Sequence, residues 1–353
     1  MTFEVDLSCG GREGIDRLYG APVSETPAPV IAIVLNWNNL TDTLECVESL
    51  RGSDYPNLTV WVVDNNSEQD PTPELHTAYP DVRVFRNTRN LGYGGGNNTG
   101  VRAALDCGAA YILLLNNDVV VAPDCVRRLV SAAQTHRRIG MATPKVFHYH
   151  RRQEVYWDGG VVDWKSGDAR HDSSNLPLEG TVIRSEWLNG SALLVRVSAI
   201  HDIGLLDDRY FLYFEDAEWS VRAARRGWTN AVVLDAHAWH KGGASTGGFE
   251  NPLMRFYFFR NRYLFVSAHY PFPGRLRWKV WYLWTMANSY VRVRHERDNR
   301  RVFLSVLGSL LSGSTGAYGD SLSMRRLTDG LDAVLTWALT VGSAAKKLLP
   351  RSR

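Results

Sequence analysis

Cysteine is scarce in this sequence, and it has no hydrophobic run long enough to cross a membrane. Among 353 residues there are four cysteines, Cys9, Cys46, Cys107 and Cys125. None has the Cys-x-x-Cys spacing of zinc or redox motifs, so reduced thiols in a cytoplasmic protein are expected. No segment reaches the roughly 20 apolar residues of a spanning helix. Met1 to Gly20 is polar and glycine-rich, unlike a secretory signal peptide.

A large excess of charge is also missing. The chain has 40 Lys and Arg against 37 Asp and Glu, a formal net charge of +3. This balance gives no indication of a polyanionic partner, and no nucleic-acid partner is expected. The hydrophobic fraction of 44% is ordinary for a globular protein.

Apolar runs of strand length alternate with helical patterns in the first part of the chain. The runs are Val30 to Leu35, Leu58 to Val63, Val82 to Phe85 and Tyr111 to Leu115. Helical spacing occurs at Thr41 to Arg51 and Thr99 to Cys107. This alternation predicts an α/β fold, with a mostly parallel central sheet and helices on both faces.

The alternation of strand and helix patterns ends near residue 140, where short predicted strands and aromatic residues begin. A helix is expected at Asp216 to Arg226, a strand at Ala231 to Leu234, and an aromatic helix at Phe249 to Tyr270. We therefore predict a lead-in over 1–28, a main domain over 29–270 and a basic, aromatic helical extension over 271–353. The main domain divides into 29–139 and 140–270.

An acid follows the fourth apolar run, in Asn116-Asn117-Asp118. A carboxylate at the carboxyl end of a strand in an α/β sheet can hold a divalent cation and a nucleotide diphosphate. A lone acid there is also a common helix cap. His240 follows another apolar strand and is the candidate second ligand, with His237 in competition. A structural role for a single histidine stays open.

Two further segments suit a nucleotide. Asp64 ends an apolar strand, where it can accept from a base imide or a ribose hydroxyl, although an Asx turn explains it equally well. In the segment Asn90 to Gly100, four glycines fall within five residues, so backbone amides there can approach phosphate or ribose oxygens. The segment matches neither a P-loop nor a dinucleotide fingerprint. A flexible hairpin is the alternative.

Adjacent acids follow an aromatic cluster, in Phe214-Glu215-Asp216. Aromatic neighbours can desolvate a carboxylate and raise its proton affinity, which suits a general base acting on a hydroxyl. Acids in the first turn of a helix also favour its dipole. Both interpretations can hold, for different residues.

Seven motifs in chain order resemble the inverting family 2 glycosyltransferases of GT-A fold, in particular their rhamnosyltransferase-like and galactofuranosyltransferase-like bacterial members. The resemblance covers residues 30–270. It depends on Asn36-Trp37-Asn38, Val63 to Ser67, Asn90 to Tyr93, Gly96 to Asn98, Leu115 to Asp118, Phe214 to Asp216, and His240.

The resemblance implies roles for individual residues. Asp216 would be the catalytic base, with Glu215 beside it. Nucleotide and donor binding would fall to Asn36, Asn38, Asp64, Asn90, Gly92, Gly96, Asn97, Asn117 and Asp118. Acceptor and donor sugar would meet at Trp187, Asn189 and Gly190. Asp118 and His240 would hold Mg²⁺ or Mn²⁺. Asn116 replaces the first acid of the family's metal motif, so the metal would bind mainly together with the sugar nucleotide.

The expected reaction is transfer of a sugar from a nucleotide diphosphate sugar to a hydroxyl of a glycan or lipid-linked glycan in cell-envelope or polysaccharide assembly. The first expectation for the donor is dTDP-L-rhamnose, followed by UDP-linked sugars. A sugar nucleotidyltransferase and a catalytically inactive glycan-binding scaffold remain as alternatives.

The extension carries aromatic residues bracketed by basic residues. They are Trp278, Trp281, Tyr282 and Trp284, with Arg275, Arg277 and Lys279 before or among them and Arg292, Arg294 and Arg297 after them. This pattern suits a helix at the inner face of the cell membrane. A helix packed on the main domain, or a homodimer contact, explains it nearly as well.

Overall fold

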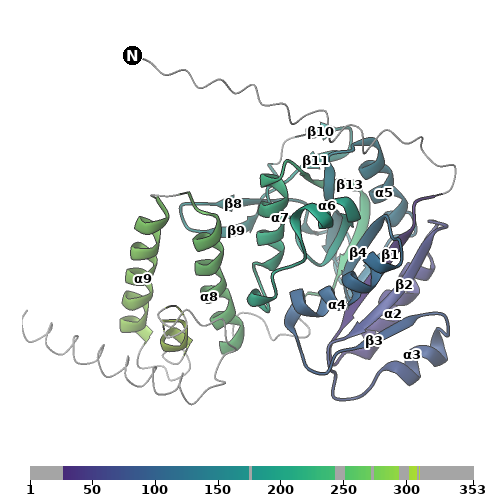
Figure 1. Cartoon of the computed structure of the whole chain (residues 1–353), viewed down its shortest axis with the longest axis horizontal. Helices are drawn as coiled ribbons and strands as arrows, with labels where there is room; N and C mark the ends of the chain where they lie inside the picture. Colours follow the sequence, from purple (N-terminus) through teal and green to yellow (C-terminus); the bar gives the residue numbers. More distant parts are fainter. Residues whose placement is uncertain are drawn as a thin grey trace, which may run out of the picture.

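A mixed β-sheet of eleven strands forms the centre of the computed structural model (Figure 1). The structure describes residues 27–174, 177–242, 251–271, 274–293, 302–307 and 310. Most of the predicted lead-in and most of the predicted extension lie outside these residues. None of the helices that the structure describes is long and apolar enough to cross a bilayer.

One half of the sheet is parallel. Its strands are β1 (Val30–Asn36), β2 (Leu58–Asp64), β3 (Arg83–Arg86) and β4 (Tyr111–Asn116). Asn36 pairs with Asp64, and Leu35 pairs with Asn116. The polar residues that end these strands therefore share one edge of the sheet, as the sequence predicts.

The other half mixes directions. β12 (Ala192–Arg196) runs antiparallel between β4 and β6 (Ile139–His148), and β6 pairs in parallel with β13 (Thr229–His240). The shorter strands added antiparallel are β5 (Val119–Val121), β7 (Val155–Trp157), β10 (Pro177–Glu179) and β11 (Val182–Arg184). A separate hairpin joins β8 (Gly160–Asp163) to β9 (Asp168–His171).

Helices cover both faces of the sheet, because successive residues of each strand point to opposite faces. Val30, Ala32 and Val34 face one core with α2 (Leu40–Arg51) and α5 (Cys125–Thr135). Ile31 and Ile33 face a second core. That core contains residues of α4 (Gly92–Asp106), α6 (Val197–Ile203) and α7 (Glu215–Arg225). The predicted α/β class is confirmed.

The glycine-rich segment differs from its prediction. It is not a loop, because α4 begins at Gly92 and takes up all four crowded glycines. A Cβ on Gly96 would lie 2.7 Å from Leu35 Cδ1, and one on Gly100 would lie 2.8 Å from Ile33 Cγ2. The glycines therefore allow this helix to lie close against β1, and tertiary packing overrides their low helix propensity.

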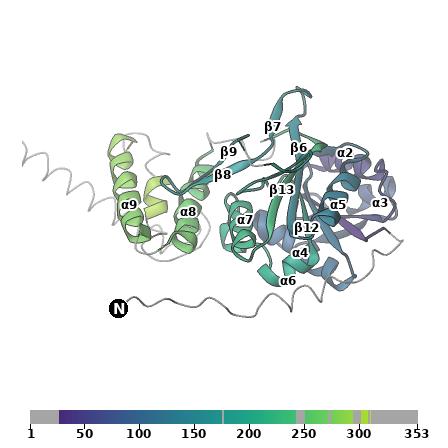
Figure 2. The same cartoon turned by 90° about the horizontal axis from the view of Figure 1, so that it is seen from above.

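Two long helices stand beside the sheet (Figures 1 and 2). They are α8 (Pro252–His269) and α9 (Gly274–Val293), and short elements complete the fold: α3 (Thr72–Ala78), the 3₁₀ helix η1 (Asp208–Tyr210) and a helical segment over 302–307. Phe265, Trp278 and Tyr282 share a third core with Phe214 and Ala217 at the start of α7. The predicted helical extension is thus present as far as it is described.

Candidate active site

The ends of β1 and β2 form a polar cluster around Asp64. Its carboxylate is fully buried and accepts from Asn36 Nδ2 at 2.8 Å, from the Ser67 amide at 3.1 Å and from the Ser67 hydroxyl. Arg86 Nε lies 3.6 Å away. These donors enclose the carboxylate, so direct contact with a nucleobase, which stays a prediction, requires one of them to give way.

A cavity of about 290 Å³ opens beside this cluster. Asn36, Asn38 and Ser67 line it together with the chain that leads into α3. Asn38 has a φ of 54° and accepts from the Glu68 amide at 2.7 Å. The cavity therefore presents amide and hydroxyl groups together with the acidic residues Glu68, Asp70 and Glu74, with Asp64 behind Asn36 and Ser67.

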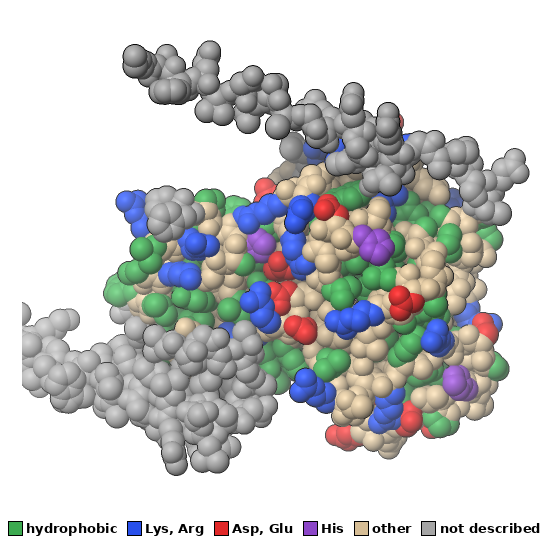
Figure 3. Space-filling model, viewed as in Figure 1, with side chains coloured by type: hydrophobic (Ala, Val, Ile, Leu, Met, Phe, Trp, Pro, Cys, Tyr) green, Lys and Arg blue, Asp and Glu red, His purple; other side chains and the backbone are tan. Residues whose placement is uncertain are grey.

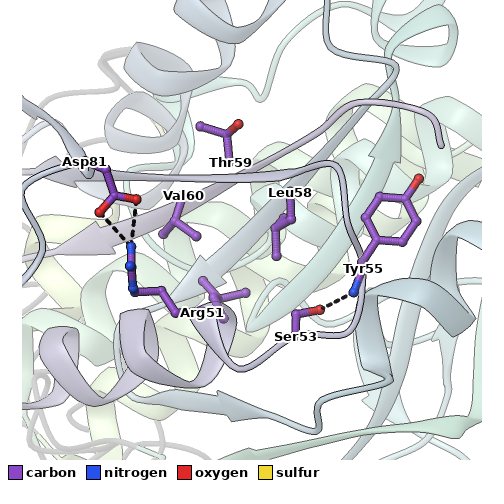
Figure 4. A pocket seen from close by; sticks show the side chains of 8 residues that line it. Arg51, Ser53, Tyr55, Leu58, Thr59, Val60 and Asp81 are labelled. Carbon is purple, nitrogen blue, oxygen red and sulfur yellow. Dashed lines mark hydrogen bonds and ion pairs between the residues drawn. The ribbon is translucent and has the colours of Figure 1, made fainter. Parts of the chain in front are cut away.

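A cavity of about 400 Å³ lies at the opposite edge of the sheet, where β2 begins (Figure 4). Arg51 lines it and donates to both carboxylate oxygens of Asp81 at 2.7 Å. None of the predicted site residues lines this cavity, so it is set apart from the candidate site.

Asp118 and His240 meet, although 122 positions separate them in the chain. His240 Nε2 lies 3.1 Å from Asp118 Oδ1, and both side chains are about nine-tenths buried. They meet because β13 pairs with β5, which places His240 opposite Val119. His237, the competing candidate, instead packs its ring against Phe147 at 5.3 Å.

This pair suits a divalent cation. Two neighbouring ligands of an octahedral ion, each about 2.1 Å from it, lie about 3 Å apart, close to the separation seen here. His240 Nδ1 is buried and makes no hydrogen bond within the described part of the chain. Among the described residues no third His, Cys, Asp or Glu joins the pair. Substrate oxygens and water would have to supply the remaining ligands.

The other residues predicted to contact the donor are largely turned inward. Asn117 Nδ2 donates to the Asn39 carbonyl at 3.0 Å and to Thr43 Oγ1 at 3.1 Å. Asn97 is fully buried. Asn90 Oδ1 accepts from the Gly92 amide at 2.8 Å and from Asn65 Nδ2 at 2.9 Å, which fixes the entry to α4. Their contact with ribose or diphosphate stays a prediction.

Asp216 lies half-buried in the first turn of α7. Its Oδ2 accepts from the Gly190 amide at 3.0 Å, and its Oδ1 accepts from the Ala217 amide at 2.7 Å. Tyr93 donates its hydroxyl to the Gly190 carbonyl. Gly190 follows Trp187 and Asn189 in the segment that enters β12. The structure thus brings the predicted base to the predicted sugar segment.

The pKa values of both acids at the start of α7 are raised. Burial, reinforced by the charge of Asp216, raises the pKa of Glu215 well above its usual range. Burial also raises the pKa of Asp216, against the stabilising amides of Gly190 and Ala217. Glu215 Oε2 has no hydrogen-bond partner, whereas Asp216 has two. Asp216 is therefore the better candidate for a carboxylate that takes up a proton.

Tyr156 lies beside the Asp118–His240 pair. Its ring meets the His240 ring edge-on at a centroid distance of 4.9 Å. Burial raises the pKa of Tyr156, and the charges of Asp118 and Asp216 act in the same direction. No sequence pattern singled out this tyrosine. It lies in β7, a strand of three residues whose position depends entirely on pairing with β6.

Comparison with known proteins identifies the family. The model of glycosyl transferase family 2 matches residues 31–178, and that of glycosyl transferase family group 2 matches residues 111–341. The chain belongs to the family 2 glycosyltransferases. It is an enzyme family whose members transfer sugars, as the resemblance implied.

Relatives of this family 2 glycosyltransferase include rhamnosyltransferases. An N-acetylglucosaminyl-diphospho-decaprenol L-rhamnosyltransferase of Mycobacterium tuberculosis is 30% identical over 211 residues, 54% of this chain and 68% of the relative. A dTDP-rhamnosyl transferase of Shigella flexneri is 22% identical over 61% of this chain and 72% of its own length. A galactofuranosyltransferase of Mycolicibacterium smegmatis is 28% identical over 58% and 72%.

A solved structure shares the GT-A fold. GalNAc-T7, crystallised with UDP, GalNAc and Mn²⁺, superposes with a TM-score of 0.59 at 17% identity. The match covers 87% of this glycosyltransferase and 55% of the GalNAc-T7 chain. At that identity the comparison supports the fold alone.

Proposed function

We propose that this enzyme transfers a sugar with inversion from a nucleotide diphosphate sugar to an acceptor hydroxyl, with Asp216 as the base. The observation that carries the proposal is the buried Asp118–His240 pair, with His240 Nε2 3.1 Å from Asp118 Oδ1, in a family 2 chain whose Asp216 is held by the Gly190 amide. The pair would serve the leaving group, and Asp216 would serve the nucleophile.

The step is a single displacement. The acceptor hydroxyl loses its proton to the Asp216 carboxylate, and its oxygen attacks the anomeric carbon. The bond from that carbon to the diphosphate oxygen breaks from the opposite face, and the nucleoside diphosphate leaves with the electron pair. The Gly190 amide, which donates to Asp216, holds the carboxylate in a fixed orientation.

Asp118 and His240 are the residues that would hold Mg²⁺ or Mn²⁺. When bound, such an ion neutralises the charge that develops on the departing diphosphate. A single protein carboxylate makes a weak site, so we infer that cation and sugar nucleotide bind together. The nucleoside part would enter the cavity lined by Asn36, Asn38 and Ser67, where Asp64 holds Asn36 and Ser67 in place.

For the substrates, the relatives favour dTDP-L-rhamnose as donor, ahead of UDP-linked sugars. The mycobacterial relative's name specifies an acceptor built on a decaprenol diphosphate. We therefore propose a lipid-linked glycan as acceptor, with the transfer taking place at the cytoplasmic side of the cell membrane. Residues 29–139 would bind the nucleotide, 140–270 would bind the acceptor and contribute the base, and 271–353 would form a separate extension.

The exposed face of α9 supports contact with a membrane. Leu276, Val280, Trp281 and Trp284 are exposed, whereas Trp278, Tyr282 and Met286 turn inward toward α8. Among the described residues, only one other large hydrophobic side chain, Trp37, is comparably exposed. Lys and Arg side chains lie among hydrophobic ones on this side of the molecule (Figure 3). A basic and aromatic face fits an anionic lipid surface.

Replacement of the base tests the proposal. Asp216→Asn keeps the shape of the side chain but cannot accept the proton, so transfer should fall at least about a hundredfold. Affinity for the nucleoside diphosphate should stay within about twofold, since the cavity at β1 and β2 is untouched. Asp81→Asn, at the far edge of the sheet, is the matched control and should keep full activity. An Asp216→Asn enzyme with normal turnover would remove the assignment.

The released product separates this proposal from a sugar nucleotidyltransferase. A glycosyltransferase releases a nucleoside diphosphate from a sugar nucleotide, whereas a nucleotidyltransferase releases pyrophosphate from a nucleoside triphosphate. Turnover with a panel of dTDP- and UDP-sugars, with and without Mn²⁺, also identifies the donor. Binding without turnover across the panel would instead favour a glycan-binding scaffold.

A further inference from the structure

The backbone just before α7 has an unusual conformation. Phe211, Tyr213 and Phe214 have positive φ angles of 62°, 68° and 71°. The Leu212 amide donates to the Tyr210 carbonyl at 2.7 Å, which closes a three-residue γ-turn around Phe211. A non-glycine residue in such a region costs about 1–3 kcal/mol. The surrounding structure must therefore hold this segment in place.

Asn261 of α8 supplies much of that restraint. It is fully buried, and its Nδ2 lies within hydrogen-bonding distance of three carbonyl oxygens of the segment. These belong to Tyr210 at 2.7 Å, Leu212 at 2.6 Å and Tyr213 at 2.8 Å. One side-chain NH2 group, with its two N–H donors, thus lies among three carbonyl groups of the segment.

Arg260 adds a second set of donors. It is 1% exposed, and its Nη2 donates to the carbonyls of Arg209 at 2.6 Å and Tyr210 at 2.9 Å. Its Nε donates to Asn261 Oδ1 at 2.8 Å, which orients the amide toward the segment. Burial lowers the pKa of Arg260 to about 10. Burying a guanidinium costs solvation free energy. The hydrogen bonds to the carbonyl groups of the segment offset that cost.

We propose that Arg260 and Asn261 are positioning residues that set the orientation of Asp216. Phe214, in the left-handed region, is the N-cap of α7, and Asp216 lies two residues beyond it. If the segment relaxed to ordinary φ angles, the first turn of α7 would rotate and the carboxylate would leave the Gly190 amide. The inference rests on the proposed role of Asp216 as base.

The test is Asn261→Leu, which has a similar shape but no donors. We expect kcat to fall about tenfold or more, with unchanged affinity for nucleoside diphosphate and Mn²⁺, because β1, β2 and the Asp118–His240 pair are untouched. The acidic limb of the kcat profile should shift, because a displaced Asp216 loses the Gly190 amide and changes its burial. A purely structural role would not move that limb.

Two variants guard against simple misfolding. Arg260→Lys keeps a cation that can reach a carbonyl, and it should give an intermediate kcat. Arg262→Ala is the matched control. Arg262 also ties α8 to a distant segment, since it donates to the Ser166 carbonyl in the β8–β9 hairpin at 2.9 Å, but it does not touch the strained segment. It should keep both kcat and the pH profile.

Full kcat in Asn261→Leu, or loss of nucleotide affinity in parallel with kcat, would overturn the inference. The outcome is distinguishable from failure of the proposed function. An active Asp216→Asn enzyme removes the base itself, whereas an inactive Asp216→Asn beside a fully active Asn261→Leu removes only the positioning role.

Discussion

At the scale of single residues, the chemistry depends on two neighbouring carboxyl groups with different surroundings. Asp216 accepts from two backbone amides, whereas Glu215 Oε2 has no partner. Both pKa values are raised, chiefly by burial. The amides stabilise the charged form of Asp216, which makes it the easier of the two carboxyl groups to ionise.

The pH dependence of turnover follows from Asp216. In the proposed mechanism the carboxylate is the active form, so activity should be lost as pH falls through a pKa that burial has raised. The acidic limb of kcat/KM should therefore lie above the ordinary aspartate pKa of about 4. Initial rates across pH with saturating Mn²⁺ measure it. A profile that stays flat down to that ordinary value would contradict the assignment.

Glu215 makes a prediction about stability. The pKa of Glu215 is higher in the folded protein than in the unfolded chain. The stabilising free energy linked to its protonated form is therefore fully present below the unfolded pKa and is lost as pH rises through the folded-state pKa. Glu215→Gln removes that ionisation. The variant should therefore melt at a higher temperature than the wild type at alkaline pH, and the gain should shrink as pH falls. Calorimetry at several pH values checks this, and a gain that grows toward acid would reverse the sign.

The Asp118–His240 pair predicts cation affinity. His240→Gln removes one of the two proposed protein ligands, so Mn²⁺ should bind at least about tenfold more weakly in the presence of nucleoside diphosphate. His237→Gln is the matched control on the same strand, because that ring packs on Phe147 instead. Electron paramagnetic resonance measures free Mn²⁺ directly. Equal affinities in the two variants would remove His240 from the site.

At the scale of elements, α4 shows what close packing requires. A Cβ on Gly100 would lie 2.8 Å from Ile33 Cγ2 and 3.0 Å from Val63 Cγ2, whereas one on Gly94 meets nothing closer than 3.5 Å. Gly100→Ala should therefore destabilise the protein by about 1–3 kcal/mol through overpacking. Gly94→Ala, in the same helix, should be neutral or stabilising by up to about 1 kcal/mol. Denaturant unfolding compares the two, and equal effects would contradict the packing argument.

The sequence predicts the elements with a strong hydrophobic pattern. The parallel strands and the approximate bounds of α2, α7 and α8 follow from their apolar residues. The start of α4 does not, because four glycines indicate a loop unless the side chains of β1 are known to lie against them. Contacts between segments distant in the sequence are likewise hidden. Sequence alone cannot reveal that Asn36 and Ser67 surround Asp64. It also cannot reveal that the three-residue strand β7 places Tyr156 against His240.

At the scale of the whole molecule, α9 gives the enzyme one face unlike the rest. Its inner face packs on α8 through Trp278 and Tyr282, and Tyr282 donates to the Phe259 carbonyl at 2.7 Å. Its outer face exposes Trp281 and Trp284, the latter by 65%. Both sequence-based interpretations of this segment can thus hold, one for each face of the helix.

Vesicle binding tests the outer face. Each tryptophan that enters the interface contributes about 1.5–3 kcal/mol, so the double variant Trp281→Ser/Trp284→Ser should bind anionic vesicles at least about tenfold more weakly. Binding by the wild type should also weaken as salt rises. Trp37→Ser, which removes an exposed tryptophan elsewhere, is the control for sedimentation. Unchanged sedimentation of the double variant, with loss of a dimer in solution, would assign this face to a second copy of the chain.

The pairing of β13 has a consequence for how this protein tolerates insertions and deletions. Between Val233 and His237 the register of β13 against β6 shifts, and only beyond that irregularity do its last three residues pair with β5. One residue gained or lost downstream of the irregularity would turn the His240 imidazole to the opposite face of the sheet. A length change within the irregularity itself can be absorbed there. The number of residues between the irregularity and His240 must therefore be kept more strictly than the identity of those residues.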